Sequence, residues 1–360
     1  MSPLLKSVEK AGIKGIKGKR NPFEIGPKDF FESGEQLRKE FAKTIKAKES
    51  NRIAIIPSAS YGIANAARNI KIGSGENVIV TGGQFPSNYY PWHRLCLENR
   101  AGLHIVGATD TTENRGKTWN ENILNAITSS TRIVAIGNVH WADGTLFDLT
   151  AIRKRTWEVG AQLVIDGTQS IGALPFNVES IQPDALICAG YKWLMGPYSI
   201  GLAYYGPHFD NGYPIEENWI NRQNSEDFAG LVNYESNYQP GALRYEVGEH
   251  SNFILAPMML EALKQINRWN PKNIQQYCKA ISKTAIKDLS KEGFWIEDEK
   301  FRAGHLFGIR IPKGIDMKVL KKKLKKNKIS VSYRGDAIRI SPHVYNKEKD
   351  LQKLVEVLLS

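Results

Sequence analysis

Two charged side chains between residues 162 and 205 are placed to do chemistry together. Asp166 ends the apolar run LVI, and Lys192 closely follows the apolar run ALICAG. If these runs are neighbouring parallel strands, their carboxyl ends meet at one edge of the sheet, where ligands bind. A lysine amine condenses with an aldehyde, and a carboxylate keeps a nearby ring nitrogen protonated. The spacing therefore predicts a site that combines a nucleophilic amine with an anionic partner.

This pair of groups is what the chemistry of pyridoxal 5'-phosphate (PLP) requires. The lysine would carry the cofactor aldehyde as a Schiff base, and the carboxylate would keep the pyridine nitrogen protonated, so that the ring accepts electrons from a carbanion. Lys192 would then return as the general base at the Cα of an amino-acid substrate. Taken alone, a buried ion pair between Asp166 and Lys192 explains the same residues, because buried charges must be paired.

The elements that must position this pair are readable from the hydrophobic pattern. Short apolar runs rich in valine and isoleucine alternate with helical stretches from residue 50 to residue 206. Apolar runs without alternation are typical of strands covered on both faces, so we expect an α/β fold with a mostly parallel seven-stranded sheet. The predicted strands are Arg52–Ile56, Asn77–Thr81, Leu103–Gly107, Arg132–Gly137, Gln162–Ile165, Ala185–Cys188 and Gly201–Tyr205.

The rest of the chain predicts a smaller α+β unit. After a loop-rich stretch, a helical pattern runs from near Phe253 to Trp269, where Asn270-Pro271 ends it. We therefore expect an N-terminal arm at 1–20, a large domain at 21–250 and a small C-terminal domain at 251–360. The small C-terminal domain is predicted to contain the helices Ile274–Leu289, Asp316–Lys326 and Glu348–Leu358 and the strands Leu306–Ile311, Ser330–Tyr333 and Ala337–Ser341.

Composition and charge limit the classes of partner that the chain is expected to bind. Its 360 residues carry a formal net charge of +12 and a sequence pI near 9.4, which raises nucleic acid, an anionic membrane or an anionic small molecule as partners. No apolar run is long enough to cross a bilayer, and no nucleic-acid-binding motif accompanies the lysine-rich helix. Cys96, Cys188 and Cys278 form no CxxC pair, so we expect no metal site. The prediction is a cytoplasmic protein that binds neither nucleic acid nor membrane.

The stretch DGTQSIGALP, followed by AGYKWLMGPYSIG, resembles the class V aminotransferase family of fold-type I PLP-dependent enzymes. That family includes cysteine desulfurases, selenocysteine lyases, kynureninase and isopenicillin N epimerase-like proteins, and the resemblance extends over about Asn21–Leu359. It implies that PLP is the cofactor, that Lys192 forms the Schiff base, that Asp166 pairs with the pyridine nitrogen and that Gln169 lies near the ring oxygen. Many relatives have histidine where this chain has Tyr191, whose hydroxyl could still bind the phosphate.

Two further segments resemble walls of the family's cofactor pocket. Ser58, Ala59 and Ser60 open a helix and match the turn that binds phosphate at a helix N-terminus. Simple N-capping by one of these serines is the alternative. Phe85 matches the residue that stacks on the cofactor ring, the alternative being a phenylalanine of the core.

The resemblance also implies residues that face the cofactor and the substrate. Trp141 aligns with a cofactor-facing position, and His140 beside it is a substrate-binding candidate that is more often structural. Arg339 aligns with the arginine that binds the α-carboxylate, because a guanidinium offers two parallel hydrogen bonds to a carboxylate. Arg334 is a second anion-binding candidate, for a side-chain carboxylate. A surface ion pair is the alternative for each arginine.

The segments ENWINRQNSEDF and YQPGALRYEVGEHSNF resemble those by which the family's dimer partner completes the site. This implies a homodimer with shared active sites, in which Arg222 and Asn218 reach the partner's substrate. Ser251, or a backbone N–H near Gly248, would contact the neighbouring phosphate, whereas Glu249 would repel it.

The absence of a cysteine before the predicted Arg339 strand limits the reactions that we expect. Desulfurases of this family carry a reactive cysteine on a loop before the arginine strand, and this chain has none between Ile311 and Arg339. Persulfide-forming desulfuration is therefore disfavoured, whereas transamination, epimerisation and β-elimination all begin with proton abstraction by Lys192. We predict a class V aminotransferase-type enzyme acting on an amino acid or keto acid. The alternatives are a lyase or epimerase of the same family and a non-catalytic basic binding protein on this fold.

Overall fold

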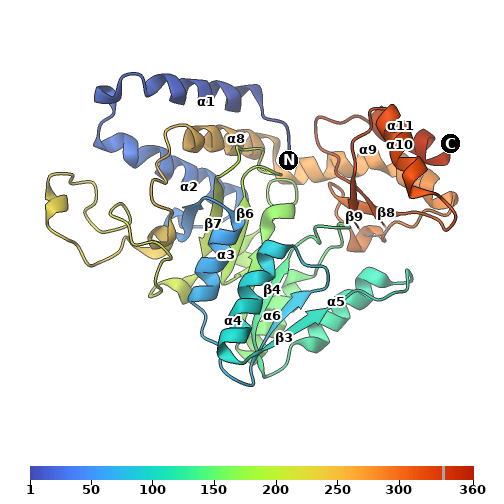
Figure 1. The fold of residues 1–360 in the computed structure, drawn as a ribbon, viewed down its shortest axis with the longest axis horizontal. Helices are drawn as coiled ribbons and strands as arrows, with labels where there is room; N and C mark the ends of the chain where they lie inside the picture. The colour runs from blue at the N-terminus through green and yellow to red at the C-terminus, as the bar shows by residue number, and fades with distance from the viewer. Residues whose placement is uncertain (335–336) are drawn as a thin grey trace.

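The computed structural model describes residues 1–334 and 337–360, and its centre is a seven-stranded sheet of order β1-β7-β6-β5-β4-β2-β3 (Figure 1). β7 runs antiparallel to β1 and β6, and the other pairings are parallel. The strands are β1 (Ile53–Ile56), β2 (Asn77–Thr81), β3 (Gly102–Val106), β4 (Thr131–Gly137), β5 (Gln162–Asp166), β6 (Ala185–Ala189) and β7 (Gly201–Tyr205). The predicted α/β fold is confirmed, and the strand bounds agree with the prediction to within one residue at each end.

Helices cover both faces of this sheet (Figure 1), which explains why its inner strands are apolar throughout. One face packs against α2, α5, α6 and α8, and the other packs against α3 and α4. Their bounds are α2 (Glu32–Ile45), α3 (Ala59–Arg68), α4 (Tyr90–Asn99), α5 (Arg115–Ala126), α6 (Leu149–Val159) and α8 (Leu255–Trp269), with the short α7 (Val178–Ile181) beside α6. β3, at the edge of the sheet, has exposed residues at its centre.

The C-terminal part builds a separate three-stranded antiparallel sheet of order β8-β10-β9. Its elements are α9 (Pro271–Lys291), β8 (Phe307–Arg310), α10 (Met317–Lys326), β9 (Ser332–Arg334), β10 (Ala337–Ile340) and α11 (Glu348–Leu359). Apolar faces of α9, α10 and α11 share one core with this sheet, and Leu320 and Leu324 of α10, at i and i+4, lie on the face that packs there. The predicted small α+β unit is present.

α8 and α9 belong to different hydrophobic cores, and the domain boundary at residue 250 stays a prediction. Ala256, Met259 and Leu263 of α8 lie in the core of the large sheet, whereas the core beside the small sheet begins with residues of α9. Asn270, with φ of 67°, and Pro271 separate the two helices. The predicted N-terminal arm forms α1 (Lys6–Gly18), which packs along α8.

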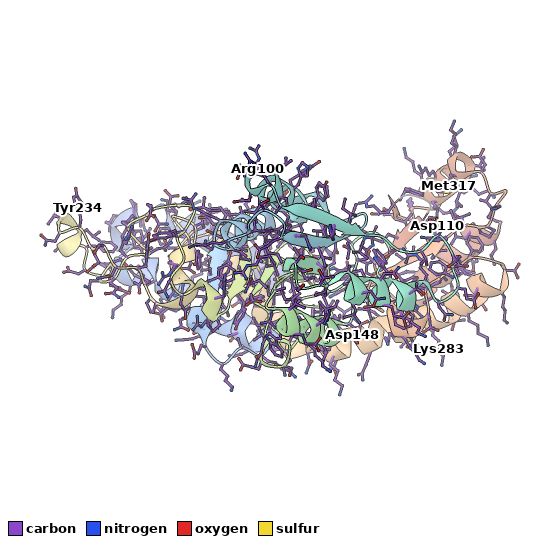
Figure 2. The ribbon with its side chains drawn as sticks, turned by 90° about the horizontal axis from the view of Figure 1, so that it is seen from below. Arg100, Asp110, Asp148, Tyr234, Lys283 and Met317 are labelled. Atoms are coloured by element: carbon purple, nitrogen blue, oxygen red, sulfur yellow. The ribbon has the colours of Figure 1, made fainter. Side chains whose placement is uncertain are left out.

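The segment containing Tyr234 projects from the body of the protein (Figure 1). Figure 2 shows Tyr234 at the opposite end of the molecule from Met317 of α10, and the Tyr234 side chain is fully exposed. Short 3₁₀ turns complete the structure at Pro22–Glu24, Pro27–Phe30, Ser50–Arg52, Pro86–Asn88, Gly167–Gln169, Pro207–Phe209, Gly230–Val232, Gly241–Tyr245 and Glu299–Phe301. No helix of the described chain is both long and apolar enough to cross a membrane.

Candidate active site

A cavity of about 250 Å³ lies where the carboxyl ends of the central strands meet the N-terminus of α3. Its size approaches the ~300–1,000 Å³ typical of small-molecule sites. All nine predicted cofactor-binding residues line it, namely Ser58, Ala59, Ser60, Phe85, Trp141, Asp166, Gln169, Tyr191 and Lys192. Residues that are far apart in the chain therefore meet at the ends of the strands, as the sequence predicts.

Lys192 and Asp166 both line the cavity, but they form no ion pair with each other. Burial lowers the pKa of the Lys192 ammonium, the charge of Asp166 raises it, and the charges of Arg339 and Arg334 lower it further, with a net downward shift. The Lys192 Nζ lies 5.2 Å from the Phe85 ring centre, and no described residue hydrogen-bonds to it. The structural ion pair left open by the sequence is therefore absent, and the amine is available as a nucleophile.

Asp166 is held by the turn that follows β5. Its Oδ1 accepts a hydrogen bond from the backbone N–H of Thr168 at 3.0 Å, and the Thr168 hydroxyl accepts one from the N–H of Ala189 at 3.1 Å. These bonds tie the end of β5 to the end of β6. Gly167 permits the close turn, since a Cβ there would lie 2.6 to 2.9 Å from three buried side chains.

Gln169 is fixed from two sides. Its side-chain Oε1 accepts a hydrogen bond from Trp193 Nε1 at 3.1 Å, and its backbone carbonyl accepts one from His305 Nε2 at 2.7 Å. His305 in turn receives a hydrogen bond at Nδ1 from Gln275 of α9, at 2.8 Å. Burial lowers the pKa of His305 to about 4, so the ring is neutral at pH 7. This link from α9 to the cavity was not predicted, because His305 is an isolated histidine in the sequence.

The N-terminus of α3 offers a site for an anion. Ser58 caps the helix, accepting a hydrogen bond from the N–H of Tyr61 at 3.2 Å, and its hydroxyl lies 2.9 Å from that of Ser60. Ser58 is therefore an N-cap residue, and this role does not exclude phosphate binding at the same helix end. Ala59 and Ser60 begin the helix, where backbone N–H groups have no helical partner and the helix dipole favours negative charge.

Aromatic side chains form the remaining walls. The Phe85 and Trp141 rings meet edge to face with centroids 5.3 Å apart, and Trp141 Nε1 donates to the carbonyl of Gly83 at 2.6 Å. Tyr191 packs against Tyr198, with centroids 4.6 Å apart, and burial raises the pKa of its hydroxyl. That hydroxyl is a neutral hydrogen-bonding group at pH 7.

The two predicted arginines lie beside this cavity rather than in its lining. Arg339 of β10 lines an adjoining cavity of about 640 Å³, and its Nη1 donates to the carbonyl of Trp141 at 2.7 Å. Arg334 of β9 stacks its guanidinium over the Trp141 ring at 5.0 Å. Burial and the charge of Arg334 lower the pKa of Arg339 to about 10, which leaves it charged at pH 7.

Two predicted substrate-binding residues are not brought to the cavity of this chain. His140 is buried, with Nδ1 3.0 Å from Asp143 Oδ1 and Nε2 3.2 Å from the carbonyl of Gly82, so both ring nitrogens serve to hold the loop that carries Trp141. Arg222 lies in the projecting segment, where it pairs with Glu217 and stacks on Tyr238.

The other residues of the predicted partner-facing turn also contact their own chain. Asn218 binds the backbone carbonyl of Glu246, the N–H of Gly248 donates to Glu216, and Ser251 is buried. Sequence reasoning missed several lining residues that are small or follow the lysine motif, namely Pro57, Ser87, Thr168, Ala189, Tyr198, Ser199 and Ile200. Their proximity to recognised motif residues was the one available signal.

Comparisons with known proteins show the family to which the chain belongs. The family model described as Aminotransferase class-V matches residues 27–354. The uncharacterized aminotransferase YcbU of Bacillus subtilis (strain 168) is 25% identical over 332 residues, which cover 91% of this chain and 84% of that protein. A cysteine desulfurase of Escherichia coli O8 (strain IAI1) is 27% identical over 176 residues, 48% of this chain and 42% of its own.

Solved structures share the whole fold. A mutant of C-DES with glycine covalently linked to its PLP cofactor has a TM-score of 0.86 and 17% identity, covering 99% of this chain and 93% of that one. The cysteine desulfurase CsdA from Escherichia coli has a TM-score of 0.80 at 17% identity, covering 99% and 91%. Such identities establish the fold alone. With the family match over residues 27–354, they make this chain a member of the aminotransferase class-V family, whose cofactor is PLP.

Proposed function

We propose that this chain holds PLP on Lys192 and acts on an amino acid by moving the proton at its Cα. The observation that carries the proposal is the largely buried Lys192 amine, whose pKa is lowered and which faces the 250 Å³ cavity without a hydrogen-bonding partner among the described residues. A lysine in this state has a larger fraction of neutral amine than an exposed one at the same pH, and the neutral amine is the form that acts as nucleophile and as general base.

The residues around the cavity fit the cofactor group by group. The α3 N-terminus with Ser58 and Ser60 suits a phosphate, and the carboxylate of Asp166 suits a protonated ring nitrogen. The Phe85 ring suits one face of a planar heterocycle. When bound, PLP supplies a ring that accepts the electrons released at the Cα.

The chain's own groups would then handle the substrate. Lys192 Nζ would accept the Cα proton and hold it for its return, and Arg339 would bind the α-carboxylate. Trp141 and Tyr198 would shield the cavity from water, since both line it. Each of these roles is a proposal that the positions of the side chains support.

Within the family we propose transamination, with β-elimination or epimerisation as the alternative. All three cysteines, Cys96, Cys188 and Cys278, are buried, and burial raises the pKa of each thiol. None lines the cavity. A reaction that passes sulfur to a protein thiol is therefore unsupported, whereas proton transfer at the Cα needs only Lys192 as base.

We also propose a cytoplasmic homodimer. The projecting segment exposes Tyr234 fully and Trp219 and Phe228 in part, and such aromatic surface favours burial against a second copy. Arg222 and Asn218 of this segment would then approach the partner's substrate. Light scattering on the holoenzyme should give twice the 40.4 kDa chain mass, and a purely monomeric solution would contradict the dimer.

The cofactor assignment is tested by colour and covalent trapping. Purified protein given PLP should be yellow, and borohydride should fix the cofactor to the peptide that contains Lys192. Lys192→Ala should lose both properties. Lys283→Ala, which removes an exposed lysine of α9 (Figure 2), is the matched control and should keep both. A wild-type protein that stays colourless after PLP addition would refute the proposal.

The reaction type needs a second experiment. Holoenzyme offered an amino acid should convert its bound cofactor to the pyridoxamine form, and a matching keto acid should restore the yellow form. Release of sulfide or ammonia with pyruvate would instead indicate β-elimination, and loss of Cα deuterium with retention of the amino acid would indicate epimerisation. Failure of the pyridoxamine half-reaction with all common amino acids would exclude transamination.

A further inference from the structure

Arg334 and Arg339 lie on one face of the small sheet. In the β9–β10 register, Arg339 is opposite Ser332 and Arg334 is opposite Ala337. Residues directly opposite each other in an antiparallel pair point to the same face, and so do residues two apart in one strand. The two arginines are therefore diagonal neighbours, close enough for two linked acidic groups to reach both.

No carboxylate of the described residues neutralises either guanidinium. Arg339 donates to the Trp141 carbonyl at 2.7 Å and is 3.4 Å from the Ser332 hydroxyl, and Arg334 donates to its neighbour's carbonyl, that of Tyr333, at 2.7 Å. The Nε atoms of both arginines are shielded from solvent without a partner among the described residues. Burial first, and then repulsion from the charge of Arg334, lower the pKa of Arg339.

Trp141 holds both guanidiniums at the edge of the cofactor cavity. Arg334 stacks on the Trp141 ring and Arg339 binds its carbonyl, while the ring itself contacts Phe85. The charges of both arginines reach Lys192, whose ammonium each of them disfavours. The face therefore lies within electrostatic range of the amine that would remove the Cα proton.

We propose that the substrate is an amino acid whose side chain carries a second acidic group, a carboxylate or a sulfinate. Arg339 binds the α-carboxylate and Arg334 binds the side-chain acid. A substrate with one carboxylate leaves one half-buried guanidinium without an anionic partner, whereas a dianion neutralises both. This inference rests on the proposed function, because it takes the same cavity as the reaction site.

Acid and amide pairs of equal shape test the inference. Wild-type holoenzyme is titrated with aspartate against asparagine and with glutamate against glutamine, and binding is read from the change in cofactor absorbance. At least one acid should bind about 10-fold or more tightly than its amide, as expected for a charge-assisted hydrogen bond. Arg334→Gln should abolish that preference and leave the affinity for the amide and for alanine within about threefold.

A control and an independent readout separate the outcomes. Arg94→Gln removes one exposed positive charge on α4 and should retain the wild-type preference. Succinate or glutarate should raise the melting temperature of wild-type protein more than butyrate does, and Arg334→Gln should remove the difference. Equal binding of acid and amide by wild type, or an unchanged preference in Arg334→Gln, overturns the inference. A protein that stays colourless with PLP would refute the proposed function instead. The melting temperatures with succinate, glutarate and butyrate would still test whether Arg334 and Arg339 bind a dianion.

Discussion

At the scale of single residues, the site depends on charges that are held apart rather than paired. Lys192 and Asp166 share a cavity without an ion pair, so each charge stays available to a bound molecule. Asp166 uses one oxygen to cap the turn after β5 and has no other hydrogen bond with the described residues. The turn fixes the position of the carboxylate, and its charge remains free for a ring nitrogen.

Replacing Asp166 with asparagine separates these two roles. The amide oxygen can still accept the Thr168 N–H, so the fold and the cofactor colour should persist, but the negative charge is lost. Turnover of the holoenzyme should fall at least about 100-fold, because the ring nitrogen loses its anionic partner. Steady-state rates and melting curves of both proteins check this. A turnover within threefold of wild type would rule out the role assigned to Asp166.

At the scale of elements, close helix contacts hold the framework behind the site. α1 lies along α8, and α8 in turn packs on α2 and the large sheet. Gly12 and Gly15 are the contact points on α1, because a Cβ at Gly12 would lie 2.7 Å from Met258 Sδ and one at Gly15 would lie 2.3 Å from the Phe253 backbone oxygen. The glycines that look like helix weakeners in the sequence are required by this packing.

Gly15→Ala should therefore destabilise the protein despite the better helix propensity of alanine. The added methyl meets rigid backbone, so we expect a loss of about 1–3 kcal/mol in the free energy of unfolding. Gly18→Ala, at the end of the same helix with open space around it, should be neutral or stabilising by up to about 1 kcal/mol. Urea unfolding of the two variants measures the difference. Equal stability of both would contradict the close contact.

At the scale of the whole molecule, two buried histidines link the parts on either side of the cavity. The rings of His305 and His343 both contact the Trp193 ring, with centroid distances of 4.5 and 5.7 Å. Burial lowers the pKa of each histidine to about 4. Neither ring nitrogen of His343 has a hydrogen-bond partner among the described residues.

These two histidines predict a loss of stability in mild acid. In the unfolded chain each titrates near 6.5, so between about pH 6.5 and 4 the unfolded state binds protons that the folded state excludes. The free energy of unfolding should fall across that range, by on the order of 3 kcal/mol per histidine at most. Above pH 6.5 both contributions are fully present.

His343→Phe tests this pH dependence while keeping the aromatic contacts. The variant should change little at pH 7.5 or gain stability, because a buried group without a hydrogen bond is removed. Its loss of stability from pH 6.5 to 4 should be smaller than that of wild type. His104→Gln, on the exposed edge strand β3, leaves both buried rings in place and should retain the wild-type slope. Chemical unfolding at several pH values measures all three.

Local sequence patterns predicted much of the fold. Apolar runs and their turn residues marked all seven strands of the large sheet to within one residue, because strand formation and burial depend on short-range patterns. The same patterns could not show that α8 packs in the core of the large sheet, since an amphipathic helix shows that one face is buried but not against which sheet. The contacts of Gly12 and Gly15 in α1 could not be predicted from the local sequence either.

The sequence by itself determined that Asp166 and Lys192 meet at one edge of the sheet, because the strands that lead into them are parallel neighbours and chain topology brings such ends together. Tertiary structure alone decided the state of those groups. It showed that Lys192 has no ion-pair partner within residues 1–334 and 337–360, that His140 is committed to Asp143 and the Gly82 carbonyl, and that Arg334 and Arg339 share one face. Burial, pKa and charge pairing depend on residues distant in the chain, so they follow from packing and not from local pattern.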